Sequence, residues 1–230
     1  MRNAGGLPNA PANRIEQNTV SRKSNGKRSE NRAASLGSVR IIGGTLRGRR
    51  LEYAADPRTR PMKDRVREAV FNLLGDIQGM TALDLFAGTG ALGFEALSRG
   101  AKAAVFVEQH FPTADVLRKN AALLELADRC EIAAADTLIW FGRANRLSQR
   151  TGGSPWLVFC SPPFELFVTR RDPMLRLLEQ LWQAAPPGSA FVVEADDRFD
   201  LSLLPEADRW LSRSYPPAHV ALAWKENHAA

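Results

Sequence analysis

Two segments of the sequence hold residues whose types and spacing could do chemistry, and the first is a glycine turn. Residues 82–93 read as a short apolar strand, a glycine-rich turn and the start of a helix. Asp84 stands four positions before Gly88, and Gly90 completes a G-x-G pattern. Glycines at such a turn leave bare backbone at a helix N-terminus, where a small molecule can approach closely. The turn therefore predicts a cofactor site.

Two cofactor classes compete for this turn. Residues 88–93 match the dinucleotide fingerprint G-x-G-x-x-G, and Glu108 follows Gly88 by 20 residues, where a ribose-binding acid is expected. Asp84 favours S-adenosylmethionine instead, because its carboxylate could meet a cationic amino-acid end and would repel a pyrophosphate. A tight turn without a ligand is the remaining alternative. The predicted cofactor-binding residues are Asp84, Phe86, Gly88, Gly90, Glu108 (at the ribose) and Asp136 (near the adenine amino group).

The second segment is Ser161-Pro162-Pro163-Phe164, which follows an apolar run. Two prolines stiffen the backbone and remove two amide donors, so carbonyl oxygens stay free to accept. The Ser161 side chain and the Pro162 carbonyl could accept hydrogens from the exocyclic amine of a nucleobase and turn its lone pair toward a methyl donor. Phe164 could stack on that base, a contact worth roughly 1–3 kcal/mol. We predict these four residues as the catalytic group, and a rigid turn is the alternative.

Strands that alternate with helices would position both segments. From residue 81 onward, short apolar runs alternate with helical patterns, which predicts an α/β fold with a parallel sheet and helices on both faces. Ligands collect at the carboxyl ends of such strands, where Asp84, Glu108, Asp136 and Ser161 fall. An antiparallel hairpin, expected around residues 216–217, suits a methyltransferase sheet better than a dehydrogenase sheet. The expected strands span residues 81–86, 103–107, 131–135, 156–160 and 190–194.

The N-terminal part of the chain is cationic. Residues 1–60 hold 13 Lys and Arg against 4 Asp and Glu, while the rest holds 18 against 21. Residues 1–38 contain few large apolar side chains and are expected to be disordered, and residues 39–230 are expected to fold. A hairpin is predicted over about residues 39–58, followed by an amphipathic helix with Lys63, Arg65 and Arg67 on its polar side. Such a front suggests a polyanionic partner or a solubilising tail.

Cysteine and histidine usage excludes several classes of protein. Cys130 and Cys160 stand in apolar segments and the three histidines lie far apart, so we expect neither a disulfide framework nor a metal site. Two buried thiols fit a reducing cytoplasm. No apolar run approaches the roughly 20 residues that cross a bilayer. We expect a cytoplasmic monomer without a membrane partner.

Several motifs occur in an informative order: Ile41–Gly48 in the hairpin, Arg60-Pro61, Asp64–Glu68, Asp84–Gly90 and the proline pair. This order resembles the RsmD-type 16S ribosomal RNA guanine-N2 methyltransferases over about residues 38–225. The resemblance implies a Rossmann-like class I methyltransferase fold with a seven-stranded, mostly parallel sheet. It also implies that S-adenosylmethionine, without a metal, methylates a guanine amino group in 16S rRNA or a small-subunit assembly particle.

The resemblance further implies that Arg60 and the helix after it border the active site, and that the hairpin helps to hold RNA. Ser161 departs from the family, which generally has Asp there, and a hydroxyl is a weaker acceptor than a carboxylate. Two alternatives follow: a non-catalytic RNA-binding ribosome assembly factor with this fold, or a DNA amino methyltransferase, some of which carry serine there. The predicted RNA-binding residues are Arg40, Arg47, Arg49, Arg50, Arg60, Lys63 and Arg65.

Overall fold

The structure is a computed structural model that describes residues 36–54, 61–142 and 151–226. These residues belong to one compact unit, Ala34–Ala230. The expected disorder of residues 1–38 falls outside the described residues except at its end, where the first strand begins at Leu36, three residues before the predicted hairpin.

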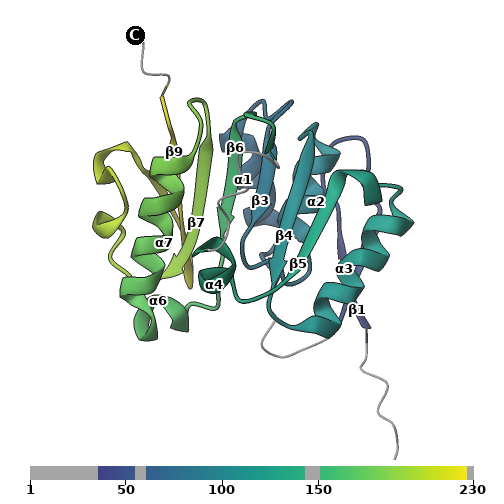
Figure 1. The fold of residues 1–230 in the computed structure, drawn as a ribbon, viewed down its shortest axis with the longest axis horizontal. Helices are drawn as coiled ribbons and strands as arrows, with labels where there is room; N and C mark the ends of the chain where they lie inside the picture. The colour runs from purple at the N-terminus through teal and green to yellow at the C-terminus, as the bar shows by residue number, and fades with distance from the viewer. Residues whose placement is uncertain (1–35, 55–60, 143–150, 227–230) are drawn as a thin grey trace, which may run out of the picture. The chain divides into compact units, whose positions relative to one another are not determined.

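A seven-stranded sheet runs through this unit (Figure 1). Its order is β5-β4-β3-β6-β7-β9-β8; the first five strands are parallel, and β9 is antiparallel to both of its neighbours. The predicted α/β fold with a seven-stranded, mostly parallel sheet is confirmed. The strands that precede the glycine turn and the proline pair, β3 and β6, are direct neighbours. The bounds are β3 Thr81–Asp84, β4 Ala103–Glu108, β5 Cys130–Ala134, β6 Trp156–Cys160, β7 Ala190–Asp196, β8 Leu211–Tyr215 and β9 Ala218–Trp224.

Alternate strand residues fill two hydrophobic cores on opposite faces of the sheet, because successive side chains of a strand point to opposite sides. Ala82 and Phe159 belong to the core beneath α1 (Asp64–Leu74), α2 (Ala91–Ser98) and α3 (Phe111–Leu123), which we call the α1–α3 core. Leu83 and Val158 belong to the core beneath α6 (Glu165–Thr169) and α7 (Arg171–Ala184). These two helices and α4 (Thr137–Gly142) cover the near face of the sheet in Figure 1. Burial on both faces explains why the central strands β3, β4, β6 and β7 are largely apolar runs.

The helices have the following bounds: α1 Asp64–Leu74, α2 Ala91–Ser98, α3 Phe111–Leu123, α4 Thr137–Gly142, α6 Glu165–Thr169 and α7 Arg171–Ala184. Short 3-10 turns occupy Ala127–Arg129, Leu201–Leu203 and Ala207–Arg209. Within the described ranges, no helix has the length and apolar character to cross a membrane.

The N-terminal hairpin forms a separate two-stranded sheet that docks on α2. Its strands, β1 (Leu36–Arg40) and β2 (Arg50–Ala54), pair antiparallel. The Ser98 carbonyl, at the end of α2, accepts a hydrogen bond from the Thr45 amide at 2.8 Å. A Cβ on Gly44, which has φ +73°, would lie 1.9 Å from the same carbonyl oxygen. Glycine is therefore required for this close approach.

Two buried charged residues connect the hairpin with α1 and α2. The prediction that Arg67 lies on the polar side of α1 is wrong, because its side chain is fully buried. Its guanidinium donates to the Arg40 carbonyl at 2.6 Å and lies 3.7 Å from the Glu95 carboxylate. Glu95 also accepts from the amides of Ile42 and Gly43 at 2.8 and 2.7 Å. Periodicity misplaces Arg67 because it does not show that the hairpin covers this side of the helix.

Candidate active site

Polar side chains gather at the carboxyl ends of four adjacent strands. Asp84 ends β3, Glu108 ends β4, Ser161 follows β6 and Glu194 lies near the end of β7. Each stands two residues after a side chain of the α1–α3 core, so all four are directed to that face of the sheet. The strand order β4-β3-β6-β7 places them in one row. The core residues that precede them are Ala82, Phe106, Phe159 and Val192.

The glycine turn joins β3 to α2 through backbone that favours glycine. Gly88 and Gly90 have φ values of 47° and 74°, in the left-handed region that other residues rarely adopt. A Cβ on Gly90 would also lie 2.5 Å from Leu117 and 2.7 Å from the ring of Phe94. Gly90 caps the N-terminus of α2. The turn therefore presents bare backbone at a helix start, as the sequence predicts.

Asp84 lies buried beneath this turn. Its carboxylate accepts a hydrogen bond from the Gly93 amide, in the first turn of α2, at 3.0 Å. Burial raises the pKa of Asp84 to about 7; the Gly93 bond acts against this rise, and the charge of Glu108 adds to it. The observed contact fixes the start of the helix against the strand. That Asp84 meets a cofactor's amino-acid end stays a prediction.

Glu108 also holds backbone beside the turn. It accepts from the Gly88 amide at 2.9 Å and from the His110 amide at 2.7 Å, one bond to each oxygen. A carboxylate oxygen has two lone pairs, so both oxygens can accept a further hydrogen. Glu108 is half-buried. Its position and its remaining acceptor capacity fit the predicted contact with ribose hydroxyls.

Asp136 and Phe86 complete the predicted cofactor set. The Asp136 carboxylate accepts from the Leu138 amide at 2.8 Å at the start of α4. The adjacent Thr137 hydroxyl donates to the Leu85 carbonyl just after β3, which ties this segment to the glycine turn. Phe86 is half-buried and packs against the core beneath α6 and α7. Carboxylates and bare backbone along one edge suit the cationic, hydroxyl-bearing surface of S-adenosylmethionine.

The proline pair begins beside the glycine turn. Phe159, two residues before Ser161, lies opposite Asp84 in the parallel register, and its carbonyl accepts from the Leu85 amide at 3.0 Å. Ser161 and Phe164 are half-buried, so both residues remain partly exposed to solvent. The two segments singled out from the sequence therefore lie on neighbouring strands.

The two proline carbonyls differ in their partners. Pro162 is buried and Pro163 is exposed. The Pro163 carbonyl accepts from the Leu166 amide of α6 at 2.9 Å. No donor in the described part of the chain hydrogen-bonds to the Pro162 carbonyl. That this oxygen accepts a hydrogen from a substrate amine stays a prediction.

Glu194 is a site residue that the sequence reasoning missed. It lies in β7, which pairs with β6, and its carboxylate accepts a hydrogen bond from the Ser161 hydroxyl. Burial raises the pKa of Glu194, and the bond from Ser161 acts in the opposite direction. Glu194 ends an apolar run, as Asp84 and Glu108 do, but it lacks the spacing to the glycine turn that singles out those two residues. The structure thus adds a carboxylate beside the serine.

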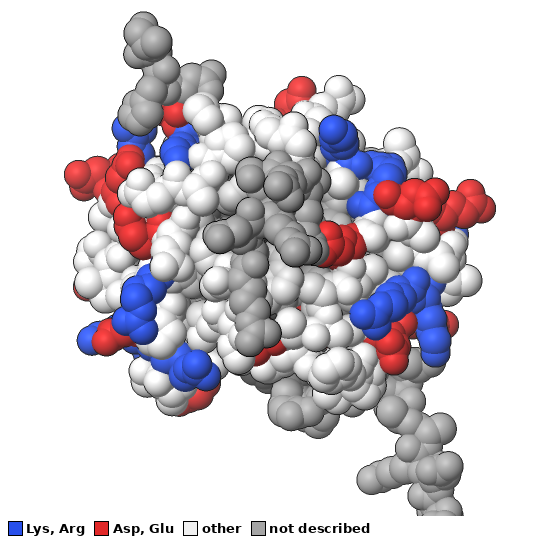
Figure 2. Space-filling model, in the orientation of Figure 1, with Lys and Arg blue, Asp and Glu red and all other residues white. Residues whose placement is uncertain are grey.

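The predicted RNA-binding residues separate into groups. Arg40, Arg50 and Lys63 line a pocket of about 380 Å³ between the hairpin and the start of α1. Arg49 instead donates to the Leu123 carbonyl at the end of α3, at 2.8 Å. Figure 2 shows one face of the molecule, over which small groups of basic and of acidic side chains are interspersed. The other members of the set are Arg47 and Arg65, which are exposed, and Arg60, which lies outside the described residues.

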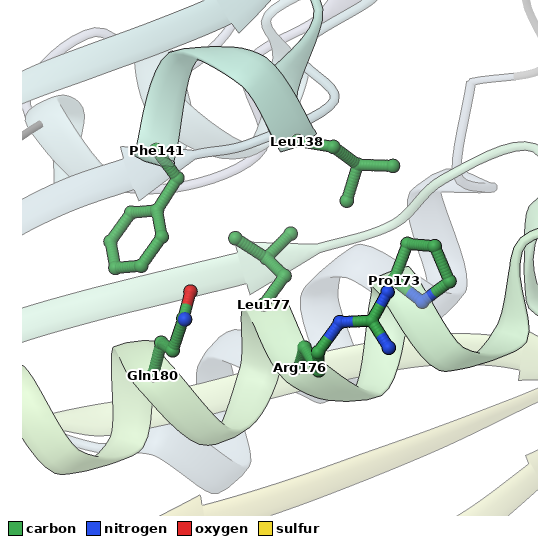
Figure 3. A pocket seen from close by; sticks show the side chains of 6 residues that line it. All are labelled: Leu138, Phe141, Pro173, Arg176, Leu177 and Gln180. Carbon is green, nitrogen blue, oxygen red and sulfur yellow. The ribbon is translucent and has the colours of Figure 1, made fainter. Parts of the chain in front are cut away.

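Another pocket, of about 180 Å³, lies between α4 and α7 (Figure 3). Four of its six lining residues are apolar, and Arg176 is the charged one. None of the predicted site residues lines it, so we do not include it in the candidate site. The lining residues are Leu138, Phe141, Pro173, Arg176, Leu177 and Gln180.

Comparison with known proteins gives a family and several relatives. The family model described as conserved hypothetical protein 95 matches residues 39–216. The ribosomal RNA small subunit methyltransferase D of Haemophilus influenzae is 35% identical over 162 residues, which are 70% of this chain and 80% of that protein.

Solved structures resemble the fold. The Escherichia coli protein yhhF aligns with a TM-score of 0.66 and 31% identity, over 83% of this chain and 99% of that one. The T. thermophilus 16S rRNA N2 G1207 methyltransferase RsmC, solved with AdoMet and guanosine, has a TM-score of 0.60 and 20% identity, over 84% and 50% of the two chains. The second likeness concerns the fold alone. From the family match and the curated relative together, the chain belongs to the family of conserved hypothetical protein 95, the RsmD-type methyltransferases.

Proposed function

We propose that this chain is an S-adenosylmethionine-dependent ribosomal RNA methyltransferase that modifies the exocyclic amino group of a guanine in 16S rRNA. The observation that carries the proposal is the row of polar groups in which Ser161, the first residue of the segment that holds the proline pair, follows the strand that pairs with β3, the strand leading into the glycine turn. Family membership supports it, as does the name of the Haemophilus influenzae relative, a ribosomal RNA small subunit methyltransferase.

S-adenosylmethionine is the cofactor that these residues fit. When bound, it supplies an electrophilic methyl group on a sulfonium. Glu108 accepts hydrogens from the ribose, Asp136 lies at the adenine amino group, and Asp84 supports the glycine turn from below. A dinucleotide fits less well, because Asp84 and Glu108 place two carboxylates beside the turn and would repel a pyrophosphate.

The remaining residues position the target amine. Its two hydrogens are accepted by the Ser161 oxygen and the Pro162 carbonyl, and Phe164 stacks on the base. These contacts direct the nitrogen lone pair toward the methyl group, so the contribution of the protein is mainly orientation and electrostatics. Bases in RNA loops are already partly unstacked, which lowers the energy needed to present one in the site.

Phosphates of the RNA are expected at the pocket lined by Arg40, Arg50 and Lys63. Lys and Arg at such a surface gain affinity by displacing counterions. Within this proposal, the hairpin is a docked part of the methyltransferase domain.

The test is methyl transfer from labelled S-adenosylmethionine to 16S rRNA, to small-subunit assembly particles and to duplex DNA in parallel. We expect label in an RNA arm and N2-methylguanosine as the modified nucleoside by mass spectrometry. Ser161→Ala should lower the transfer rate, while Glu179→Gln, an exposed substitution on α7, should not. Cofactor binding without transfer to any RNA would favour the non-catalytic assembly factor, and label in DNA alone would favour the DNA methyltransferase.

A further inference from the structure

We propose that the Glu194 carboxylate orients and polarises the Ser161 hydroxyl and accepts, through it, the proton that leaves the methylated amine. Glu194 is then a positioning residue that acts through Ser161. The inference rests on the proposed function and extends it by one residue. It also gives a physical account of a serine at a position where a carboxylate would be the stronger acceptor.

The contact is built by the pairing of β6 with β7. Cys160 lies opposite Val193 in the parallel register, so the next residues, Ser161 and Glu194, come level at the carboxyl edge of the sheet. The Ser161 hydroxyl donates to Glu194. With its proton directed at the carboxylate, the serine oxygen keeps its lone pairs for a hydrogen of the incoming amine. The acceptor is therefore oriented before the base arrives.

Few groups offset the energetic cost of burying the Glu194 carboxylate. It is 9% exposed, and Ser161 is its hydrogen-bond partner among the side chains of the described residues. No charged neighbour in the described part of the chain contributes to its pKa, which burial raises. A buried carboxylate with one neutral donor has a heightened proton affinity, which suits a group that must accept a proton near neutral pH.

The proton inventory of the step balances. The amine nitrogen bonds to the methyl carbon as the carbon–sulfur bond breaks, and that bond's electron pair stays on sulfur. The excess proton on nitrogen passes to the Ser161 oxygen while the serine's own proton passes to Glu194. Ser161 is regenerated as a hydroxyl, and Glu194 ends neutral and later releases its proton to water.

The test compares wild type with Glu194→Gln in methyl transfer to 16S rRNA, with kcat, the KM for RNA and the Kd for cofactor measured separately. Glutamine keeps the size of the side chain and an acceptor for Ser161, but it cannot take the proton. We expect kcat to fall on the order of 100-fold while KM and Kd stay near their wild-type values. Asp196→Asn, which removes a carboxylate two residues later in the same strand, is the matched control and should leave kcat unchanged.

A second variant separates this role from a structural one. Ser161→Asp in the Glu194→Gln background places a carboxylate directly at the amine, and we expect it to recover about tenfold or more of the lost kcat. Equal activity of wild type and Glu194→Gln overturns this inference alone, as does a failure of the double variant to recover kcat. A wild-type enzyme that transfers no methyl group to any rRNA overturns the proposed function and this inference together.

Discussion

Two buried glutamates, Glu95 in α2 and Glu194 in β7, have opposite surroundings. Glu95 is fully buried and accepts from Arg99 at 2.7 Å and from two backbone amides of the hairpin, with Arg67 3.7 Å away. Glu194 accepts from the hydroxyl of Ser161 and has no cation against it within the described ranges. One carboxylate is held by two cations and two amides, and the other by one neutral donor.

The difference indicates what each carboxylate can do. A buried charge with a full set of partners is expensive to remove and has no capacity left for a substrate, so Glu95 serves to hold the hairpin on α2. A buried carboxylate with a single partner is ready to bind a proton. The contrast therefore separates a structural acid from a reactive one, and each of the following changes tests one side of it.

The largest expected effect is on stability, from Glu95→Gln. The substitution removes the carboxylate that Arg67 and Arg99 share in the interior, and it leaves Asp64, 3.1 Å from Arg67, as the remaining countercharge of that buried guanidinium. Breaking a buried ion pair costs about 3–5 kcal/mol, and because Asp64 remains we expect the lower end of this range. Chemical denaturation should show a loss of this size in the free energy of unfolding. The exposed control on α1, Glu68→Gln, should lie within about 0.5 kcal/mol of wild type. A Glu95→Gln variant as stable as the Glu68→Gln control would contradict the structural role of Glu95.

Asp84 is a third buried carboxylate and provides a pH-dependent test. Burial raises its pKa from 3.8 to about 7, so between these values the folded chain binds more protons than the unfolded chain. Its contribution to stability is full below pH 3.8 and is lost as the pH rises toward 7. At about 1.36 kcal/mol per pH unit, the stability of wild type relative to Asp84→Asn should fall by up to about 4 kcal/mol. Denaturation of both proteins from pH 4 to pH 8 measures this; a constant difference would contradict it.

The sequence predicts those site residues that belong to a motif along the chain, and it does not predict those that depend on the pairing of strands. Spacing to the glycine turn predicts Asp84 and Glu108 as site residues, and the proline pair predicts Ser161; both signals are patterns along the chain. Glu194 belongs to no such motif, and its role depends on Ser161, 33 positions earlier. That proximity arises from the pairing of β6 with β7, which no local pattern encodes.

For the fold, too, local sequence patterns predict the elements and do not predict what packs against them. The alternation of strands and helices predicted the parallel sheet, because burial on both faces requires continuous apolar runs. The expected first strand reached residue 86, whereas β3 ends at Asp84 and the glycine turn begins earlier. Arg67 was predicted on a polar face because helical periodicity carries no information on what packs over the helix.

The basic residues of the hairpin and the start of α1 also differ in whether a group of the protein already binds them. The Arg49 guanidinium already binds the Leu123 carbonyl, whereas Lys63 is exposed in the pocket shared with Arg40 and Arg50. If that pocket holds a phosphate, Lys63→Ala should lower the slope of log affinity against log salt by about 1. Arg49→Ala should change the slope less. RNA binding measured at several salt concentrations tests this, and equal slopes for all three proteins would contradict it.

The smallest expected effect completes the comparison of the two glutamates and concerns the stability of Glu194→Gln. Because the pKa of Glu194 is higher in the folded chain, wild type loses stability relative to the variant as the pH rises above the ordinary value of 4.5. At pH 8 the variant should be at least as stable as wild type, and this advantage should vanish toward pH 4. Thermal and chemical denaturation at both pH values measure it. A variant that is clearly less stable at pH 8 would place Glu194 with Glu95 among the structural acids, whereas a stable variant with a low kcat would show that its burial serves the reaction.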